Sequence, residues 1–201
     1  MSRGLLLVVS GPSGVGKGTV CKYLAEKEPD IFLSVSATSR EPRPGEVDGE
    51  HYYFITPEKF KEMIADDEFL EYANYVSSSY GTPKKPCFEH LEQGNSVILE
   101  IEVQGGTKVK QKYPQTVMIF MVPPDMEILR ERLSGRGTET QEIVDKRISR
   151  AYEEFEYLDK YDYIVVNDDV EKAAKRIKSI ICAEKLRAEK NLCDIRRELK
   201  I

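Results

Sequence analysis

A glycine-rich stretch near the start of the sequence has the residue types of a phosphate-binding loop. It reads GPSGVGKGT at residues 11–19 and directly follows the apolar run at residues 5–9. Glycines let the backbone turn so that successive N–H groups face one anion, and the positive end of a following helix adds to the attraction. Lys17 could then reach the outer phosphates of a nucleotide. The stretch departs from the pattern G-x-x-x-x-G-K-[ST], because Gly18 follows the lysine and the hydroxyl comes one place later, at Thr19.

Two interpretations of this stretch compete. It could be a glycine-rich turn that only connects a strand to a helix, but the glycines, the lysine and the flanking segments together favour a phosphate-binding loop. The late hydroxyl leaves the magnesium contact open: Thr19 could bind the ion directly or through water, or phosphates and solvent could hold most of it. The candidate nucleotide-binding residues are Gly11, Pro12, Ser13, Gly14, Val15, Gly16, Lys17, Gly18 and Thr19.

A second set of anion-binding side chains follows the strand-like segment at residues 32–38. Arg40 and Arg43 stand after this segment, and GEHYYF, which contains Tyr52, comes next. Two guanidinium forks together with phenol hydroxyls form a specific binder for a dianionic phosphate. Taken alone, the segment would be interpreted as a solvated basic turn with core tyrosines.

A third basic group consists of Arg132, Arg136, Arg147 and Arg150. Arg147 and Arg150 lie three residues apart, so they share one side of a predicted helix. Alone, these residues would be interpreted as ordinary exposed helix charges. Glycines on both sides of Arg136 indicate a mobile lid instead, at about residues 134–150.

The elements that must position these groups alternate along the chain. Short apolar strands separated by helices predict an α/β fold in which helices cover both faces of a parallel sheet. Strands are expected at residues 5–10, 32–38, 51–55, 69–76, 96–103, 116–122 and 163–166, and helices at 17–27, from 57, and at 85–93, 125–133, 141–161 and 170–199. Residues 77–83 are expected to form a loop. The chain is predicted to be one domain over residues 1–201, with a core at 1–33 and 95–201 and an inserted lobe at 34–94.

Composition excludes several classes of protein. With 30 basic and 35 acidic residues the net charge is −5, which argues against a general nucleic-acid binder. No apolar run approaches the ~18 residues that span a bilayer, and the start of the chain does not look like a secretory signal. The four cysteines are scattered and there are only two histidines, which favours free thiols in the cytoplasm over a zinc site.

Taken together, the motifs closely resemble those of guanylate kinase, the family that transfers a phosphoryl group from ATP to GMP. The resemblance covers about residues 5–185 and rests on GPSGVGKGT, SVSATSREPRPGEVDGEHYYF, FLEYANY, YGTP, ILEIEVQG, RLSGRGTET with KRISRA, and IVVNDD. The form G-K-G-T is also similar to that of other nucleoside monophosphate kinases. Gly18 is therefore interpreted as a family variant. The resemblance implies a P-loop sheet with an inserted GMP-binding lobe and an arginine-bearing lid.

The resemblance also implies a role for each candidate residue. The GMP-binding residues would be Ser36, Arg40, Arg43, Tyr52, Glu71, Tyr80, Thr82 and Glu102. Glu71 would accept hydrogen bonds from N1–H and the 2-amino group of guanine, donors that adenine does not offer there. Glu102 stands where aspartate is commoner, so guanine contact and water-mediated magnesium contact both stay open.

On the ATP side, the loop residues would act with Arg132 and Asn167. Lys17, Arg40, Arg136 and Arg147 would be catalytic, and Thr19 and Glu100 would contact Mg2+, either directly or through water. For Asn167, a simple turn after a strand is nearly as good an interpretation. ATP and GMP are the expected partners, with no nucleic acid and no membrane.

Two alternative functions are considered beside guanylate kinase activity. A guanylate-kinase-like scaffold domain would bind proteins without catalysis, but such domains typically lose the phosphate loop that this chain keeps. An enzyme for another monophosphate, or a nucleotide-triggered switch, is the second. The sequence leaves the oligomeric state open, because the charged tail at residues 183–201 could be a partner helix or a solvated end; a solvated end is slightly favoured.

Overall fold

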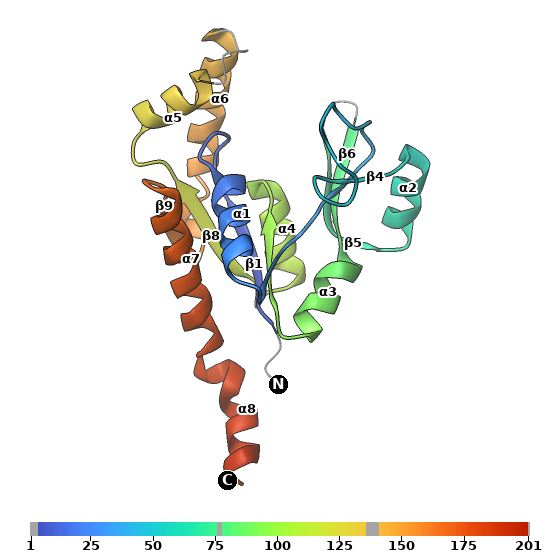
Figure 1. The fold of residues 1–201 in the computed structure, drawn as a ribbon, viewed down its shortest axis with the longest axis vertical. Helices are drawn as coiled ribbons and strands as arrows, with labels where there is room; N and C mark the ends of the chain where they lie inside the picture. Colours follow the sequence, from blue (N-terminus) through green and yellow to red (C-terminus); the bar gives the residue numbers. More distant parts are fainter. Residues whose placement is uncertain (1–3, 76–77, 136–140, 201) are drawn as a thin grey trace.

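The central sheet of the computed structural model, which describes residues 4–75, 78–135 and 141–200, consists of five parallel strands (Figure 1). Its order is β2-β7-β1-β8-β9. The strands are β1 (Leu6–Ser10), β2 (Ile31–Leu33), β7 (Ser96–Glu100), β8 (Val117–Val122) and β9 (Tyr163–Val166). The predicted α/β fold with a parallel sheet is confirmed.

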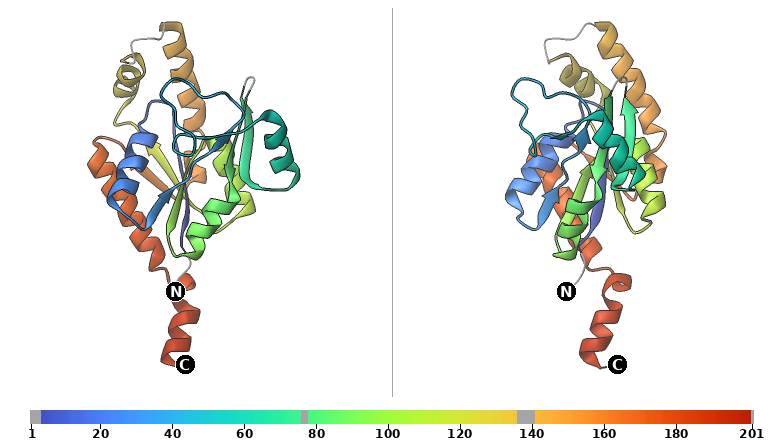
Figure 2. Two further views of the ribbon diagram at one scale, coloured as in Figure 1. Left: turned by 45° about the vertical axis from the view of Figure 1, so that its right-hand side comes forward. Right: turned by 90° about the vertical axis from the view of Figure 1, so that its right-hand side faces the viewer.

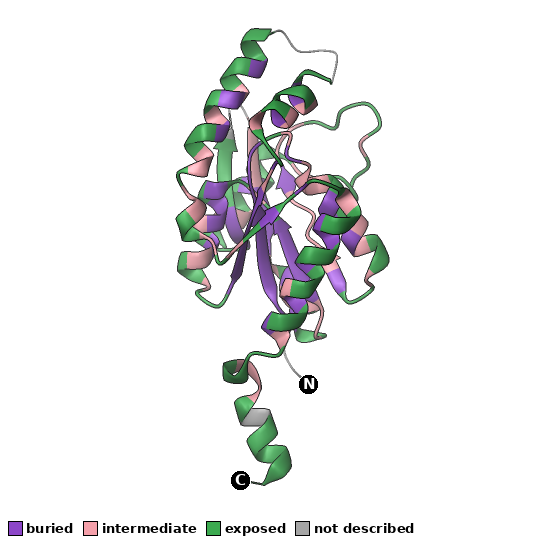
Figure 3. Cartoon of the chain, turned by 90° about the vertical axis from the view of Figure 1, so that its left-hand side faces the viewer, coloured by how far each residue is buried: buried purple, intermediate pink, exposed green. Residues whose placement is uncertain are grey.

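Helices cover both faces of this sheet, which explains why β1 is apolar throughout. Leu7 and Val9 pack against α1 (Lys17–Lys27) and α7 (Val170–Lys185). Leu6 and Val8 point to the other face, where α3 (Lys84–Glu92) and α4 (Val103–Lys112) contribute Leu91 and Val109. A strand that is buried on both faces has a continuous apolar sequence instead of alternating apolar and polar residues. Figure 3 shows the buried residues concentrated in this sheet and on the inner sides of the helices.

A second, four-stranded sheet lies beside the first, in the order β4-β3-β6-β5 (Figure 2). Its strands are β3 (Ala37–Thr38), β4 (Tyr53–Phe54), β5 (Phe69–Tyr75) and β6 (Ser78–Pro83), and α2 (Pro57–Ala65) packs on it through Phe60. The prediction of a loop at 77–83 is wrong for residues 78–83, because β6 pairs antiparallel with both β5 and β3; residue 77 lies outside the described residues. The polar residues of β6 are typical of a loop, and only the neighbouring strands make it a strand.

Three predicted strands have clearly different limits. The strand expected at 51–55 is shortened to β4, Tyr53–Phe54. The strand expected at 32–38 is divided between the sheets, since β2 pairs with β7 and β3 pairs with β4 and β6. The strand expected at 96–103 ends at Glu100, and Glu102 is instead the residue that precedes the first turn of α4. The division of the chain into core, inserted lobe and lid stays a prediction.

The C-terminal half contains α5 (Met126–Ser134), α6 (Gln141–Phe155), a short 3-10 turn (Leu158–Lys160), α7 and α8 (Ala188–Leu199). The helix expected at 141–161 therefore ends at Phe155, and the one expected at 170–199 is broken around Leu186. Figures 1 and 2 show α8 extending beyond the end of the sheet, with the C-terminus at its tip. Among the described residues, no helix is both long and apolar enough to span a bilayer.

Helix α2 offers a direct test of local stability. The Thr56 hydroxyl accepts a hydrogen bond from the Lys59 N–H at 3.2 Å, and Pro57 occupies the first turn. Thr56→Ala leaves that N–H without its protein partner and is expected to lower the free energy of unfolding by about 1 kcal/mol. Urea denaturation measures the effect, and Thr56→Ser is the control that keeps the acceptor. Equal loss in both variants would contradict the capping role.

Candidate active site

The glycine-rich loop joins β1 to α1, as the sequence predicts. Gly14 and Gly16 have φ angles of 84° and 93°, in the left-handed region that side chains disfavour. The Lys17 ammonium donates to the carbonyl of Gly11 and, at 3.2 Å, to that of Pro12. Burial lowers the pKa of Lys17, whereas the Glu100 carboxylate opposes this shift. The loop thus holds a cation at the carboxyl edge of the central sheet, where P-loop proteins bind phosphates.

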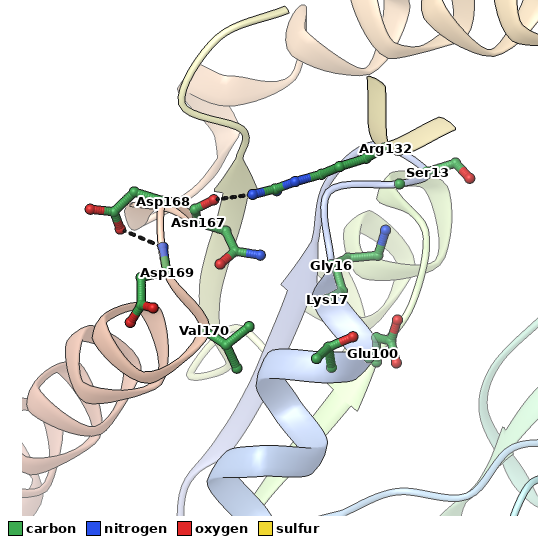
Figure 4. A pocket seen from close by; sticks show the side chains of 12 residues that line it. Ser13, Gly16, Lys17, Glu100, Arg132, Asn167, Asp168, Asp169 and Val170 are labelled. Carbon is green, nitrogen blue, oxygen red and sulfur yellow. Dashed lines mark hydrogen bonds between the residues drawn. The ribbon is translucent and has the colours of Figure 1, made fainter. Parts of the chain in front are cut away.

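Asn167, which follows β9, and Arg132, which lies on α5, both donate hydrogen bonds to this loop. The Asn167 amide Nδ2 donates to the Val15 carbonyl at 2.7 Å, and Arg132 donates to the same carbonyl at 3.3 Å. Arg132 also donates to the Asn167 carbonyl at 3.1 Å (Figure 4). A Cβ at Gly16 would lie only 2.5 Å from Asn167 Nδ2, so glycine allows this close approach. Both residues therefore position the loop.

A cavity of about 680 Å³, here named the loop cavity, opens beside the glycine-rich loop (Figure 4). It brings together most of the residues that the sequence assigns to ATP. Sequence reasoning missed the stretch that completes its wall after Asn167, although IVVNDD was among the recognised motifs. The lining residues are Ser13, Gly14, Gly16, Lys17, Gly18, Thr19, Glu100, Arg132, Asn167, Asp168, Asp169 and Val170.

The structure gives a steric reason for glycine at position 18. A Cβ at this position would lie 3.2 Å from Glu100 Oε2, closer than an ordinary contact. Glycine therefore leaves room for a carboxylate directly beside the loop. Burial raises the pKa of Glu100, and the Lys17 ammonium opposes that shift. Two features are therefore linked: the hydroxyl comes one place later, at Thr19, and the space beside Gly18 is taken by Glu100, the acid at the end of β7.

Thr19 and Glu100 both line the loop cavity, as the predicted metal contacts require. Within the described ranges, no three His, Cys, Asp or Glu side chains are grouped closely enough to hold a metal ion. Mg2+ at nucleotide sites typically takes one or two protein carboxylates together with phosphate oxygens and waters. A hydroxyl and one carboxylate beside a phosphate-binding loop fit that kind of site.

A second cavity, of about 500 Å³, lies between the two sheets and is named the second-sheet cavity. It gathers five of the predicted GMP-binding residues: Ser36, Tyr52, Glu71, Tyr80 and Glu102. Burial raises the pKa of Glu71, and the hydrogen bond from Thr82 opposes the shift. The Thr82 hydroxyl is fully buried and donates to Glu71 Oε1 at 2.9 Å. Thr82 thus orients the carboxylate that the sequence analysis assigns to base recognition.

The two arginines after β3 differ in their surroundings. Arg40 donates through both terminal nitrogens to the Glu46 carboxylate, at 2.7 and 2.9 Å, and its guanidinium lies 5.3 Å from the Tyr52 ring centre. Hydrogen bonding from Arg40 lowers the pKa of Glu46 to about 2. The Arg43 side chain is exposed, and its backbone N–H also donates to Glu46 at 2.7 Å. Sequence reasoning missed Glu46, although an acid six residues after Arg40 in a turn was a usable signal.

A middle cavity of about 320 Å³ connects the other two through shared lining residues. It shares Lys17 and Glu100 with the loop cavity, and Glu102 and Arg150 with the second-sheet cavity. Arg147 and Arg150 both line it from α6, as their three-residue spacing predicts. Arg136, the other predicted lid arginine, lies outside the described residues.

Two acids complete the middle cavity. Glu102 accepts a hydrogen bond from Arg150 at 2.8 Å, which joins the start of α4 to α6. Glu154, which the sequence analysis missed, also lines the cavity, and burial raises its pKa. Its position one turn after Arg150 on the same helix was the available signal.

Comparison with known proteins matches nearly the whole chain to one family. A family model described as guanylate kinase matches residues 3–184. A guanylate kinase of Caldanaerobacter subterraneus is 55% identical over 189 residues, covering 94% of this chain and 92% of that protein. One of Carboxydothermus hydrogenoformans is 50% identical, covering 94% and 93%. The crystal structure of guanylate kinase from Anaplasma phagocytophilum superposes with a TM-score of 0.78 at 34% identity, covering 97% of this chain and 94% of that one. The chain belongs to the guanylate kinase family.

Proposed function

We propose that this enzyme transfers the γ-phosphoryl group of ATP to GMP, giving ADP and GDP. The observation that carries the proposal is the continuity of the three cavities. Glu100 lines both the loop cavity and the second-sheet cavity, and the middle cavity between them is lined by Lys17, Glu100 and Glu102. Two nucleotides bound from opposite sides would therefore bring their phosphate ends together there. Such alignment is the main requirement of phosphoryl transfer.

ATP would occupy the loop cavity. The backbone N–H groups of the glycine-rich loop and the start of α1 would bind its phosphates, with Lys17 reaching the outer ones. The residues around Asn167 and Asp168 would line the base end. Arg132 would act through the loop, because it donates to the Val15 carbonyl.

GMP would occupy the second-sheet cavity. Tyr52 and Tyr80, which line the cavity, would hold its phosphate together with Arg40, whose guanidinium lies beside the Tyr52 ring. Arg43 could approach from its exposed position. Glu71 would accept from guanine N1–H and the 2-amino group, with Ser36 beside it. An adenine would leave this desolvated carboxylate partly unpaired, at a cost of ~1–3 kcal/mol or more.

Transfer would be direct and in line, without a phospho-enzyme. The attacking GMP phosphate oxygen is already anionic, so the reaction needs no general base. Lys17 and the cationic side chains of α6 would stabilise charge on the moving group. Mg2+, held beside Thr19 and Glu100 with the phosphates, would neutralise charge on the ATP phosphates.

A coupled assay with ATP and each nucleoside monophosphate tests the proposal. We expect GMP to be the preferred acceptor. A preference for AMP or UMP would contradict the assignment of Glu71. Absence of turnover combined with tight peptide binding would instead support the scaffold alternative.

Three further expectations stay predictions. The lid around Arg136 and the GMP side should close together, which would exclude water from the transferred group. Deoxy-GMP is expected to be an acceptor as well. Location in the cytoplasm is expected from the scattered positions of the four cysteines in the sequence.

Glu46 provides a prediction about GMP affinity. It holds the outer edge of the Arg40 guanidinium, whereas Arg40 Nε is buried and, among the described residues, has no hydrogen-bond partner. Tyr80, which interacts with Arg40, also lines the second-sheet cavity, so a phosphate bound there would lie beside this guanidinium. Glu46→Gln weakens the support of Arg40 and is expected to raise KM for GMP about tenfold with little change in KM for ATP.

The exposed neighbour Glu50 provides the matched control, Glu50→Gln. Steady-state kinetics with each substrate varied in turn measures both constants. A lower KM for GMP in Glu46→Gln would show that Glu46 competes with the GMP phosphate for Arg40. An unchanged KM for GMP would show that Glu46 has no role in GMP binding.

A further inference from the structure

Helix α8 presents a narrow apolar stripe to solvent. Ala188, Leu192, Ile195 and Leu199 follow one another at steps of four, three and four residues. At 100° per residue these four positions fall within about 60° of arc, which is typical of a coiled-coil seam rather than of a helix that covers a sheet. Leu192, Ile195 and Leu199 are 45%, 47% and 63% exposed.

The position of α8 makes this stripe accessible. Figures 1 and 2 show the helix extending away from both sheets, and Figure 3 shows exposed residues along nearly its whole length. It has 12 residues. An isolated helix of that length is only marginally stable in water, and most helices gain their stability by packing an apolar face. Contact with another apolar helix would supply that packing.

We propose that α8 pairs with α8 of a second copy of this chain, antiparallel about a twofold axis. This inference does not depend on the proposed function. With the axis midway between Leu192 and Ile195, Leu192 faces Ile195 of the second copy and Ala188 faces Leu199 of the second copy. Every layer of the seam is then apolar: the two central layers pair Leu192 with Ile195, and each outer layer pairs the small Ala188 with the large Leu199.

The charges beside the stripe select the antiparallel arrangement. Glu189 and Arg196 lie on the same flank, seven residues apart. In an antiparallel pair like flanks meet, so Glu189 faces Arg196 of the second copy, and symmetry forms this ion pair twice. On the other flank Asn191 faces Glu198 of the second copy, which adds no repulsion between like charges.

A parallel pair fits less well. It would place the flank of Glu189 and Arg196 beside the flank of Asn191 and Glu198, where Glu189 finds no cation. It would also bring both globular bodies to the same end of the pair. The antiparallel arrangement puts the bodies at opposite ends, because each body is joined to the N-terminal end of its own α8 (Figure 1).

Sedimentation velocity of the full chain tests the proposal. The contact is short, about 18 Å of helix, so a reversible dimer with a dissociation constant in roughly the micromolar range is expected. Ile195→Asp buries a charge in the central layers and is expected to give a monomer at every concentration. Kinase activity and circular dichroism verify that the variant is folded.

A charge exchange identifies the register. Glu189→Arg and Arg196→Glu are each expected to weaken the dimer roughly 3- to 10-fold, and the double variant to restore it. Within its own chain Glu189 pairs with Arg187 at 3.2 Å, and the double variant does not restore that pair. Recovery of the dimer must therefore come from contacts between copies.

Four results would overturn the proposal. The chain could stay monomeric up to about 1 mM, far above the expected dissociation constant. A dimer could persist in Ile195→Asp, which would place the contact on another surface. The double variant could fail to restore the dimer. A monomeric chain could bind anionic lipid vesicles through α8, which would assign the stripe to a membrane surface.

Discussion

Lys17→Met is expected to lower turnover about 10³-fold or more, while the affinity for GMP stays within about twofold. Lys17 is the cation at the junction of the loop cavity and the middle cavity. In phosphoryl transfer, preorganised positive charge beside the moving group supplies much of the rate enhancement. Methionine is apolar and carries no charge, so the variant tests the charge itself. GMP would bind through the second sheet, which Lys17 does not belong to.

The structure allows a matched control for this variant. Lys22 lies on the same helix and is exposed, so Lys22→Met removes an equal charge away from the cavities. Coupled assays measure turnover, and isothermal titration calorimetry measures GMP binding. If the turnover of Lys17→Met stayed within tenfold of the wild-type value, Lys17 would have no major role in phosphoryl transfer. Loss of GMP binding as well would indicate that Lys17 supports the fold of the site.

Glu71→Gln is expected to reduce kcat/KM for GMP about 10²-fold or more. The carboxylate is buried, and one of its oxygens accepts from the Thr82 hydroxyl. A Cβ at Gly105 would lie 2.9 Å from the other oxygen, so glycine at this position leaves room for the carboxylate. Glutamine would turn an N–H donor toward the N1–H or the 2-amino group of guanine. Two donors would then face each other in a desolvated site.

Thr82→Val serves as the graded comparison. It removes the hydrogen bond that orients Glu71 but leaves both carboxylate oxygens, so a smaller fall, about 5- to 10-fold, is expected. IMP lacks the 2-amino group, and the ratio of GMP to IMP activity should therefore fall in Glu71→Gln. An unchanged ratio would mean that Glu71 does not contact this edge of the base.

Stability provides an independent check on the Glu71 variant. Burial raises the pKa of Glu71 in the folded protein, so the ionised carboxylate disfavours the fold. The cost is present above the folded-state pKa and is lost as the pH falls below it. Glu71→Gln is accordingly expected to leave Tm at neutral pH unchanged or to raise it. Reduced activity together with a lower Tm would point to a structural defect instead.

The sequence by itself determined the parts that depend on neighbours along the chain. The glycine-rich loop, the buried strand before it and the helix after it are contiguous, so spacing and residue type are enough to place them. The same holds for Thr56 at the start of α2 and for Arg147 and Arg150 on one side of α6. The parallel sheet also followed, because strands buried on both faces are apolar throughout.

Tertiary structure alone decided the contacts between distant residues. It made Ser78–Pro83 a strand through pairing with β3 and β5, and it divided residues 32–38 between two sheets. Tertiary contacts also placed Thr82 against Glu71 and Arg150 against Glu102, 11 and 48 residues apart. For Gly18, the sequence marked only a departure from a motif; the fold brings Glu100 to it across the sheet, and the missing side chain leaves space for that carboxylate. Such contacts arise because packing brings together groups whose separation along the chain carries no local signal.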